Sequence, residues 1–513
     1  MTDHTASTSP DRTAEAPAGP AAAWAAAGVI AAVTGLIAGH LAAALFLPRA
    51  APLSAISDVV IAFSPPEVTE WGIETFGTAD KPLLQTGIAF ALALAGAVAG
   101  LAWRRAPIAG ALIAAVLAAA GAAAAITRPE LGAAAALPSI IAGAWAAACL
   151  HWWATRGAAR DASGRRRFLA AVAGIGAAAF AATLLARRFG PGSVEADRDA
   201  FTVPEPDLPA TDPGPGADLD VAGLAPWRTP NGDFYRIDTA ITSPAVDVES
   251  WELRVHGMVG QVRTYTFDDL LGRELIERDI TLCCVSNPVG GSLVGNARWI
   301  GVSLADLLAE SDPDPAADQL VSRSADGWTA GTPASMVFDG RDALIAVGMN
   351  GAPLPVDHGW PARMVVPGLY GYVSATKWLV DLELTTFDAY DPYWIERDWA
   401  LPAPVHTASR IDTPGSKADA GTVTVAGVAW AQHRGISAVE LKVDDGPWTA
   451  CELSDVATDD TWRQWRYDWD AESGDHTLTV RATDGDGRVQ TDEVAPPKPS
   501  GATGLHNVKI TVA

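Results

Sequence analysis

The chain has 513 residues, of which 49% are hydrophobic, and its formal net charge is −24 at pH 7. This length exceeds that of one ordinary soluble domain, so we expect several domains. The acidic balance argues against a nucleic-acid-binding protein and favours a soluble exterior or a cationic partner.

The apolar residues crowd the first 190 positions and indicate membrane-spanning helices. Residues 1–20 are polar and predict a disordered cytoplasmic tail, and residues 21–189 predict a membrane domain of about five transmembrane helices. The expected spans cover residues 23–46, 84–103, 107–127, 132–154 and 168–186. The stretch 51–83 carries prolines and acidic residues, and we expect an extramembrane or re-entrant loop there.

Arginines predict the orientation of these spans. They gather between the second and third spans and between the fourth and fifth, which places both loops and the amino terminus in the cytoplasm. After an odd number of spans, the rest of the chain is expected outside the cytoplasm, as in a multi-pass protein of the cell membrane. The run Arg165-Arg166-Arg167 resembles an internal twin-arginine export signal, although a plain positive-inside cluster also explains it.

Two histidines, His40 and His151, fall within the expected spans, where haem ligands are often found. At 1.5 Å per residue their depths differ by roughly 20 Å, so they cannot ligate one iron. We interpret them as packing or snorkelling residues.

The downstream half predicts three segments. Residues 190–225, rich in Pro, Gly and Asp, are expected to form a semi-extended linker that lets the next domain stand off the membrane. Residues 226–400 mix strand-like and helix-like runs, typical of an α+β domain, with Thr266 and Ser303 placed to cap two helices. Residues 401–513 alternate at period two between Gly-Asp turns and predict an all-β sandwich.

A strand-like run from Ile280 to Val285 delivers two adjacent thiols, Cys283 and Cys284, to a Ser-Asn-Pro turn. Neighbouring strand residues point to opposite faces, so only one sulfur can enter a site at the strand end. One thiolate is too few for a zinc site, but it can complete the shell of a metal that arrives with other ligands. A buried structural pair, or a thiol nucleophile with a histidine in reach, remains an open alternative.

The motif Cys284-Val285-Ser286-Asn287 resembles the molybdenum-ligating Cys-x-x-Asn segment of the sulfite oxidase family of molybdopterin enzymes. Three further stretches follow the order of that family's motifs: Phe234-Tyr235-Arg236 with 251–257, then 358–368, then Lys377-Trp378-Leu379. The resemblance spans roughly residues 225 to 513. It implies that residues 226–400 bind one Mo-molybdopterin per chain and that residues 401–513 form an immunoglobulin-like dimerisation-type domain.

Matched position by position, the resemblance implies that Cys284 is the catalytic residue and the metal ligand. It implies cofactor contacts for Tyr235, Arg236, Cys284, Ser324, His358, Arg363, Ala375, Thr376 and Lys377, with Ser324 placed by spacing alone. We expect Asn287 to order the turn behind Cys284, and Cys283 to pack on the opposite side of the strand.

The chain departs from the family pattern at two points. Sulfite oxidases tend to place arginines after the Cys-x-x-Asn motif, whereas this chain has Pro288-Val289-Gly290-Gly291. A substrate-side tyrosine is replaced by Val347. Both changes weaken sulfite as the substrate and leave the cofactor assignment untouched.

The resemblance implies a membrane-anchored oxidoreductase that transfers an oxygen atom on a small sulfur or nitrogen oxo-compound such as sulfite, outside the cytoplasm. The alternatives are an S- or N-oxide reductase, such as a methionine sulfoxide reductase, on the same cofactor, or a cofactor-free binding module. No haem or iron–sulfur cysteine spacing is present, so we expect a separate electron carrier, either a cytochrome or a quinone-linked membrane protein. The other expected partners are a small-molecule substrate, the membrane and a second copy of the chain, and no nucleic acid.

Overall fold

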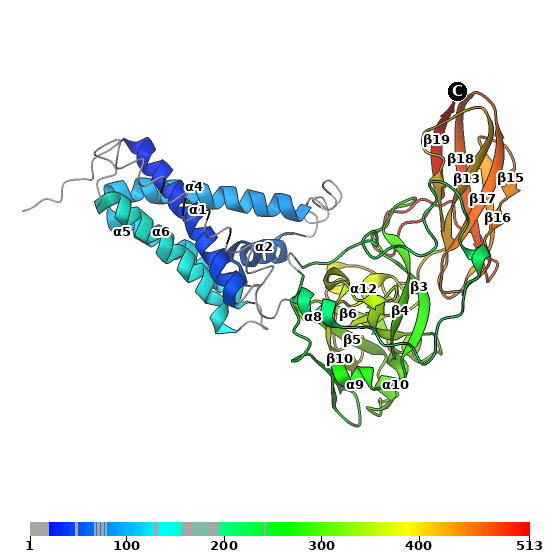
Figure 1. The fold of residues 1–513 in the computed structure, drawn as a ribbon, viewed down its shortest axis with the longest axis horizontal. Helices are drawn as coiled ribbons and strands as arrows, with labels where there is room; N and C mark the ends of the chain where they lie inside the picture. The colour runs from blue at the N-terminus through cyan, green and yellow to red at the C-terminus, as the bar shows by residue number, and fades with distance from the viewer. Residues whose placement is uncertain are drawn as a thin grey trace, which may run out of the picture. The chain divides into compact units, whose positions relative to one another are not determined.

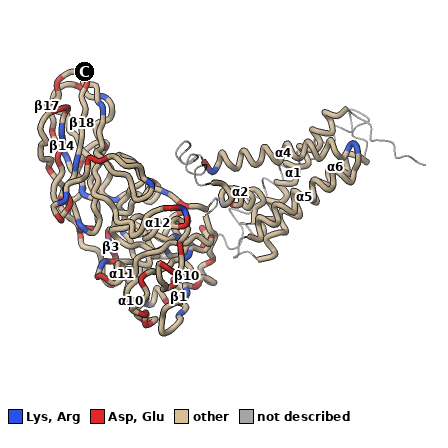
Figure 2. The backbone as a smooth tube through the Cα atoms, turned by 180° about the vertical axis from the view of Figure 1, so that it is seen from behind, with Lys and Arg blue, Asp and Glu red and all other residues tan. Residues whose placement is uncertain are grey.

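The computed structural model describes residues 20–46, 50–65, 80–127, 132–155, 194–240 and 243–513, with a few single positions between them. The chain divides into two compact units (Figure 1). One comprises Met1–Ser193 with Ala240–Thr242, and the other comprises Val194–Thr239 with Ser243–Ala513. Charged residues are frequent along the second unit and sparse along the helices of the first (Figure 2).

Long apolar helices form the first unit. They are α1 (Ala21–Phe46), α4 (Asp80–Arg105), α5 (Pro107–Ile126) and α6 (Leu137–Thr155), which follows the short η3 (Ala133–Ala136). Within the described residues, four helices are long and apolar enough to cross a membrane. Apart from single positions, the predicted fifth span and the arginine run lie outside the described residues.

The prediction of a loop across residues 51–83 is wrong for its first part. A short helix, α2 (Pro52–Phe63), occupies this stretch. Pro52 stands in its first turn, where the missing N–H costs nothing, and a run of apolar residues follows. Proline at this position starts a helix, although a proline further along would break one.

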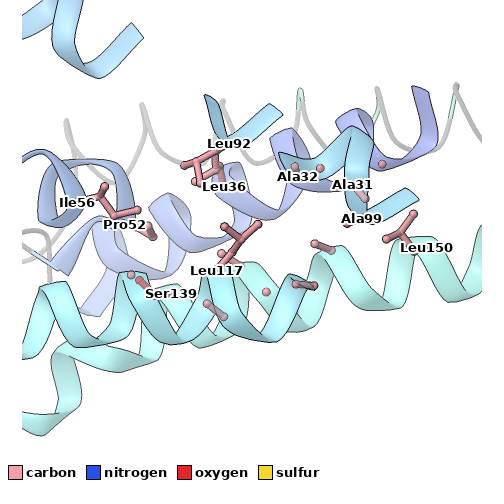
Figure 3. Close-up of a pocket in the computed structure, with 18 residues that line it drawn as sticks. Ala31, Ala32, Leu36, Pro52, Ile56, Leu92, Ala99, Leu117, Ser139 and Leu150 are labelled. Atoms are coloured by element: carbon pink, nitrogen blue, oxygen red, sulfur yellow. The ribbon is translucent and has the colours of Figure 1, made fainter. Parts of the chain in front are cut away.

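Helix α1 packs against α4 and α6 through small residues. A methyl group on Gly28 would lie 2.0 Å from the Gly96 carbonyl oxygen, so only glycine permits this approach. A narrow apolar cavity lies between these helices, with leucines and alanines on its walls (Figure 3). His40 hydrogen-bonds the Leu36 carbonyl of its own helix at 2.9 Å, which fits the packing role predicted for it.

Two sheets organise the α+β part of the second unit. The first has the order β2-β1-β10-β5-β6, and the second has the order β3-β4-β7-β8 with β9 also paired to β7. The strands are β1 (Glu252–Gly257), β2 (Arg263–Thr266), β3 (Ile276–Cys283), β4 (Val294–Ser303), β5 (Gln319–Ser324), β6 (Thr329–Pro333), β7 (Leu344–Met349), β8 (Ala352–Pro353), β9 (Arg363–Val365) and β10 (Leu379–Thr385).

Short helices connect these strands. They are α9 (Phe267–Leu271), α10 (Leu304–Ala309), α11 (Ala334–Val337), α12 (Gly371–Ser374), η5 (Val356–His358) and η6 (Ile395–Arg397). Both predicted caps are confirmed, because Thr266 accepts a hydrogen bond from the Asp269 N–H at 3.2 Å and Ser303 accepts one from the Asp306 N–H at 3.2 Å.

The predicted linker is not a free spacer over its described part, residues 194–225. It contains α8 (Val194–Ala200) and η4 (Pro215–Ala217), and the side chains of Val194 and Ala217 join the core of the α+β part. Leu208 lies beside β3, where its N–H donates to the Leu275 carbonyl at 3.1 Å and its carbonyl accepts from the Glu277 N–H at 2.9 Å. Apolar residues spaced between the prolines hold this segment against the domain.

The carboxy-terminal part is a sandwich of two sheets, ordered β11-β13-β17-β16 and β12-β19-β18-β14-β15. Apolar residues from both sheets form one shared core. Its strands are β11 (Ala408–Thr413), β12 (Lys417–Ala418), β13 (Gly421–Trp430), β14 (Ile436–Val443), β15 (Trp448–Ala450), β16 (Glu452–Leu453), β17 (Arg463–Ala471), β18 (Gly474–Asp484) and β19 (His506–Val512).

The sandwich is joined to the α+β part by buried contacts. Trp462 donates its indole N–H to the Trp227 carbonyl at 2.7 Å, and its backbone N–H donates to the Thr281 hydroxyl at 2.8 Å. Thr281 belongs to β3, so this seam packs against the strand that ends at the two thiols.

We expect Trp462→Phe to lower the free energy of unfolding by about 0.5–1.5 kcal/mol, because one buried hydrogen bond to the Trp227 carbonyl is lost while the Asn296 amide still donates to that oxygen at 2.9 Å. Thermal and denaturant unfolding of the full chain in detergent measures this. The matched control is Trp465→Phe, since Trp465 is as buried as Trp462 and its indole N–H has no hydrogen-bond partner within the described part of the chain. Equal losses for the two variants would contradict the assignment.

Candidate functional site

The turn after β3 presents Cys284. Beyond Cys283 the strand pairing stops, and the Cys284 N–H still donates to the Leu293 carbonyl at 2.9 Å. The Asn287 side-chain oxygen accepts from the Leu293 N–H at 2.8 Å, and the Asn287 N–H donates to the Cys284 carbonyl at 3.1 Å. Asn287 therefore orders this turn, as its predicted role requires.

The two thiols have different neighbours. The Cys283 thiol donates to the Cys284 carbonyl at 3.5 Å and shares a cavity wall with Asn287 and Trp430, of which Trp430 belongs to the sandwich. The pKa of Cys284 is lowered by Ser286 nearby, against the larger effect of burial. Burial raises the pKa of both thiols, so neither ionises readily at neutral pH without a metal to displace the proton.

Tyr235 lies close to this turn. Burial raises the pKa of its phenol well above the usual range, and the charge on Cys284 raises it further, more than Cys283 does. A methyl group on Gly371 would lie 3.7 Å from the Tyr235 hydroxyl and 3.8 Å from the Cys283 carbonyl. The end of β3, Tyr235 and the start of α12 therefore meet at one place.

Arg363, on β9, is a buried cation with 4% exposure. Its two terminal nitrogens donate to the carbonyls of His358 at 3.1 Å and Ala375 at 3.3 Å, and its plane lies 4.8 Å from the Trp299 ring centre. Its Nε has no hydrogen-bond partner, and no carboxylate among the described residues pairs with it. Burial lowers the pKa of this guanidinium to about 10.

Lys377 and His358 are also buried. The Lys377 ammonium donates to Asp238 at 2.8 Å and to the Asp357 carbonyl at 3.0 Å, and burial lowers its pKa to about 8. Burial, followed by the charges of Arg363 and Lys377, lowers the pKa of His358 to about 4. His358 is therefore neutral at pH 7 and offers a hydrogen bond rather than a charge.

The other predicted residues differ in how closely they are connected to Arg363, Lys377 and His358. The Arg236 side chain is 40% exposed and is engaged by Asp238 at 3.0 Å and Asp357 at 2.9 Å. Thr376 is fully buried, and its hydroxyl lies 2.7 Å from that of Ser322. Ser324 ends β5, and its N–H donates to the Trp328 carbonyl at 2.9 Å, with no contact that ties it to Arg363.

Sequence reasoning missed Ser286, Ser322 and Asp238. Ser286 lies inside the Cys-x-x-Asn motif, which already pointed to it, and Asp238 follows Arg236 by two positions, a spacing that favours a charge pair. Ser322 carries no such signal, because it lies 54 positions from Thr376 and only the tertiary fold brings the two hydroxyls together.

A small cavity of about 30 Å³ lies beside the turn, at the seam with the sandwich. None of the residues that line it is charged. Val289 and Tyr370 come from the α+β part, and Ser409, Trp430 and Gln490 come from the sandwich side. This side of the thiol pair offers hydrogen-bonding groups and apolar surface without a cation.

These features fit an anionic cofactor that carries a metal with most of its ligands. The unpaired Nε and the uncompensated charge of Arg363 call for an anion. Among the described residues there is no group of three or more His, Cys, Asp or Glu able to hold a metal ion, so Cys284 would be a single protein ligand. A soft thiolate that completes the coordination begun by a cofactor matches this donor set.

The comparisons with known proteins agree with this description. Residues 240–394 match the family model described as oxidoreductase molybdopterin binding domain. Sulfite oxidase from Gallus gallus is 30% identical over 322 residues, covering 53% of this chain and 69% of that protein. An uncharacterized oxidoreductase, YuiH from Bacillus subtilis (strain 168), is 32% identical over 139 residues, 27% of this chain and 67% of that protein.

More distant likenesses extend this set. Human mitochondrial sulfite oxidase is 27% identical over 329 residues, and the match spans 53% of this chain and 58% of that protein's length. The sulfane dehydrogenase SoxCD from Paracoccus pantotrophus is a similar solved structure, with a TM-score of 0.48 and 21% identity over 56% of this chain and 83% of that one. By its cofactor domain and its similarity to the Gallus gallus protein, the chain belongs to the sulfite oxidase family of molybdopterin-dependent oxidoreductases.

Proposed function

We propose that this chain is a membrane-anchored enzyme that transfers an oxygen atom to or from a small sulfur or nitrogen oxo-compound, such as sulfite, outside the cytoplasm. The observation that carries the proposal is the buried Arg363 guanidinium, which has no counter-ion among the described residues and shares a neighbour, Tyr235, with the strand-end thiol of Cys284. An anionic cofactor that brings its own metal accounts for both groups.

In this proposal each residue of the cluster has its own role. Cys284 is the single protein ligand of molybdenum and acts as the thiolate. Arg363 pairs with the anionic part of the pterin, and neutral His358 adds a hydrogen bond. Lys377 contributes a further N–H, with Ala375 and Thr376 beside it. Arg236 and Ser324 complete the proposed set at its periphery.

The cofactor, when bound, supplies two-electron oxygen-atom transfer. In the oxidative direction the substrate gains an oxygen from water, and two protons and two electrons leave. In the reductive direction the substrate loses its oxygen as water and takes up two protons and two electrons. The Tyr235 phenol stays protonated because burial raises its pKa, so its hydroxyl can donate a hydrogen bond at the strand end. A separate cytochrome or quinone-linked membrane protein exchanges the electrons.

The proposed domain plan follows the sequence. Residues 21–189 anchor the protein, residues 226–400 bind the cofactor, and residues 401–513 form an immunoglobulin-like dimerisation-type domain. Apolar helices α1, α4, α5 and α6 support the anchor, and the arginine bias of the loops supports an extracytoplasmic active site.

A second candidate is a reductase of S- or N-oxides on the same cofactor. The observation that favours it is the Pro-Val-Gly-Gly stretch after Asn287, which stands where sulfite oxidases tend to place arginines, together with Val347 in place of a substrate-side tyrosine. A sulfite anion prefers a cationic pocket, whereas an uncharged sulfoxide does not. Turnover of sulfite with an oxidising dye, compared with turnover of methionine sulfoxide with a reduced dye, separates the two directions.

We expect Cys284→Ser to abolish molybdenum binding and Cys283→Ser to retain it, because only Cys284 serves as the thiolate ligand. The measurement is molybdenum per chain by elemental analysis of protein made in a host that synthesises the cofactor. Both variants should keep the wild-type far-ultraviolet circular dichroism spectrum. The reverse pattern, with loss only in Cys283→Ser, would exchange the roles of the two thiols.

We expect Arg363→Met to lose the cofactor while the unfolding free energy of the cofactor-free protein falls by no more than about 1 kcal/mol. The removed charge has no ion-pair partner in the part of the chain that the structure describes, so little electrostatic stabilisation disappears with it. The control Arg298→Met should instead destabilise the fold by about 1–3 kcal/mol, because Arg298 pairs at 2.6 Å with the buried Asp279. Full molybdenum content in Arg363→Met would rule out the anion-binding role.

A further inference from the structure

Asp238 is a buried carboxylate placed between two cations. Its side chain is 4% exposed and lies 2.8 Å from the Lys377 ammonium and 3.0 Å from the Arg236 guanidinium. The Lys377 side chain is 10% exposed, whereas that of Arg236 is 40% exposed. Asp238 therefore makes its less solvent-screened ion pair with Lys377.

The hydrogen bonds of Lys377 leave part of its ammonium available. Its Nζ donates to the Asp238 carboxylate at 2.8 Å and to the Asp357 carbonyl at 3.0 Å. An ammonium group carries three N–H donors, so one is left beyond these two acceptors, and the Nζ also lies 4.5 Å from the centre of the Trp378 ring. Two fixed partners restrict where that third donor can point, because the geometry at nitrogen is tetrahedral.

The charges around Lys377 are balanced as a set. Asp238 and Asp357 offset Lys377 and Arg236, through contacts of 2.8, 3.0 and 2.9 Å. Arg363 stands outside this balance, since no carboxylate among the described residues pairs with it. The anionic cofactor thus meets one unbalanced cation and one ammonium that is already held in place.

We propose that Asp238 is a positioning residue, which acts through Lys377 by holding its ammonium charged and oriented toward the bound cofactor. This inference rests on the proposed function, because it assigns Asp238 a part in retaining the molybdopterin. Asp238 itself need not touch the cofactor.

The titration of Lys377 makes the role measurable. Burial is the largest cause that lowers its pKa, Asp238 raises it, the charges of Arg363 and Arg236 lower it, and together these effects bring the pKa to about 8. The remaining groups that face Lys377 are His358, which is neutral above about pH 4, and Asp357, whose carbonyl accepts its hydrogen bond. Lys377 is charged below its pKa, so it loses its charge as the pH rises, and removal of Asp238 moves that loss to lower pH.

The test uses the full chain loaded with cofactor, as wild type and as Asp238→Asn, Lys377→Arg and the double variant. Each protein is dialysed at a series of pH values, and the retained molybdenum and pterin are measured per chain. We expect the midpoint of cofactor loss in Asp238→Asn to lie about 1–3 pH units below that of the wild type. Lys377→Arg and the double variant should lack this pH-dependent step, because arginine stays charged throughout.

Two controls separate this role from a structural one. Asp238→Glu keeps the charge and should hold the midpoint near that of the wild type. Asp342→Asn breaks a remote ion pair, with Arg278 at 2.7 Å, and should leave the midpoint unchanged. Thermal unfolding of the cofactor-free variants shows that each one is folded.

An unchanged midpoint in folded Asp238→Asn would overturn the inference. So would a double variant that still loses the cofactor at the lower pH, since Asp238 would then act by a route other than Lys377. Wild-type protein that contains no molybdenum would instead defeat the proposed function itself.

Discussion

The buried guanidinium of Arg363 is the constraint on which the candidate site depends. Strand β9 pairs with β7, β7 pairs with β4, and β4 pairs with β3, so one sheet carries Arg363, Trp299 beneath it and the strand that ends at the thiols. Placing a lone charge in such a core costs several kcal/mol, and two carbonyls and an indole face repay only part of that cost. A protein that keeps such a residue gains most when an anion arrives. Burial is the main reason why the neighbouring lysine and histidine have depressed pKa values, and the charge of Arg363 lowers both pKa values further.

Much of this fold could be predicted from local patterns. Threonine and serine before apolar runs marked the starts of α9 and α10, and period-two alternation marked the sandwich strands. The turn at Asn287 could likewise be predicted, because its hydrogen bonds join residues that are close in sequence. The pairing of Lys377 with Asp238, 139 positions apart, could not be predicted, since only the tertiary fold brings those groups together. The sequence around Arg236 likewise gave no sign of its ion pair with Asp357. This pair holds the arginine at the exposed edge of the site.

The two thiols at the end of β3 lie in different surroundings. Cys283 belongs to a seam shared with the sandwich, where it lines a small cavity together with Trp430 and Asn287. Cys284 sits one residue beyond the last pairing, close to Tyr235. A shift of one residue in the register of β3 would exchange these surroundings. The buried contact of Trp462 with Thr281 helps to prevent that shift, because it fixes the strand from the sandwich side.

The segment after residue 193 has a practical consequence. Leu208 is hydrogen-bonded to the residues on both sides of Ile276, so the chain already pairs with β3 at this point. Composition alone would start the domain later, at residue 226. A soluble fragment begun at residue 226 would strip this edge from the strand that presents the thiols, whereas one begun at residue 194 would keep it. For the same reason, cleavage by a protease within residues 194–225 would loosen the α+β part as well as separate it from the helices of the first unit.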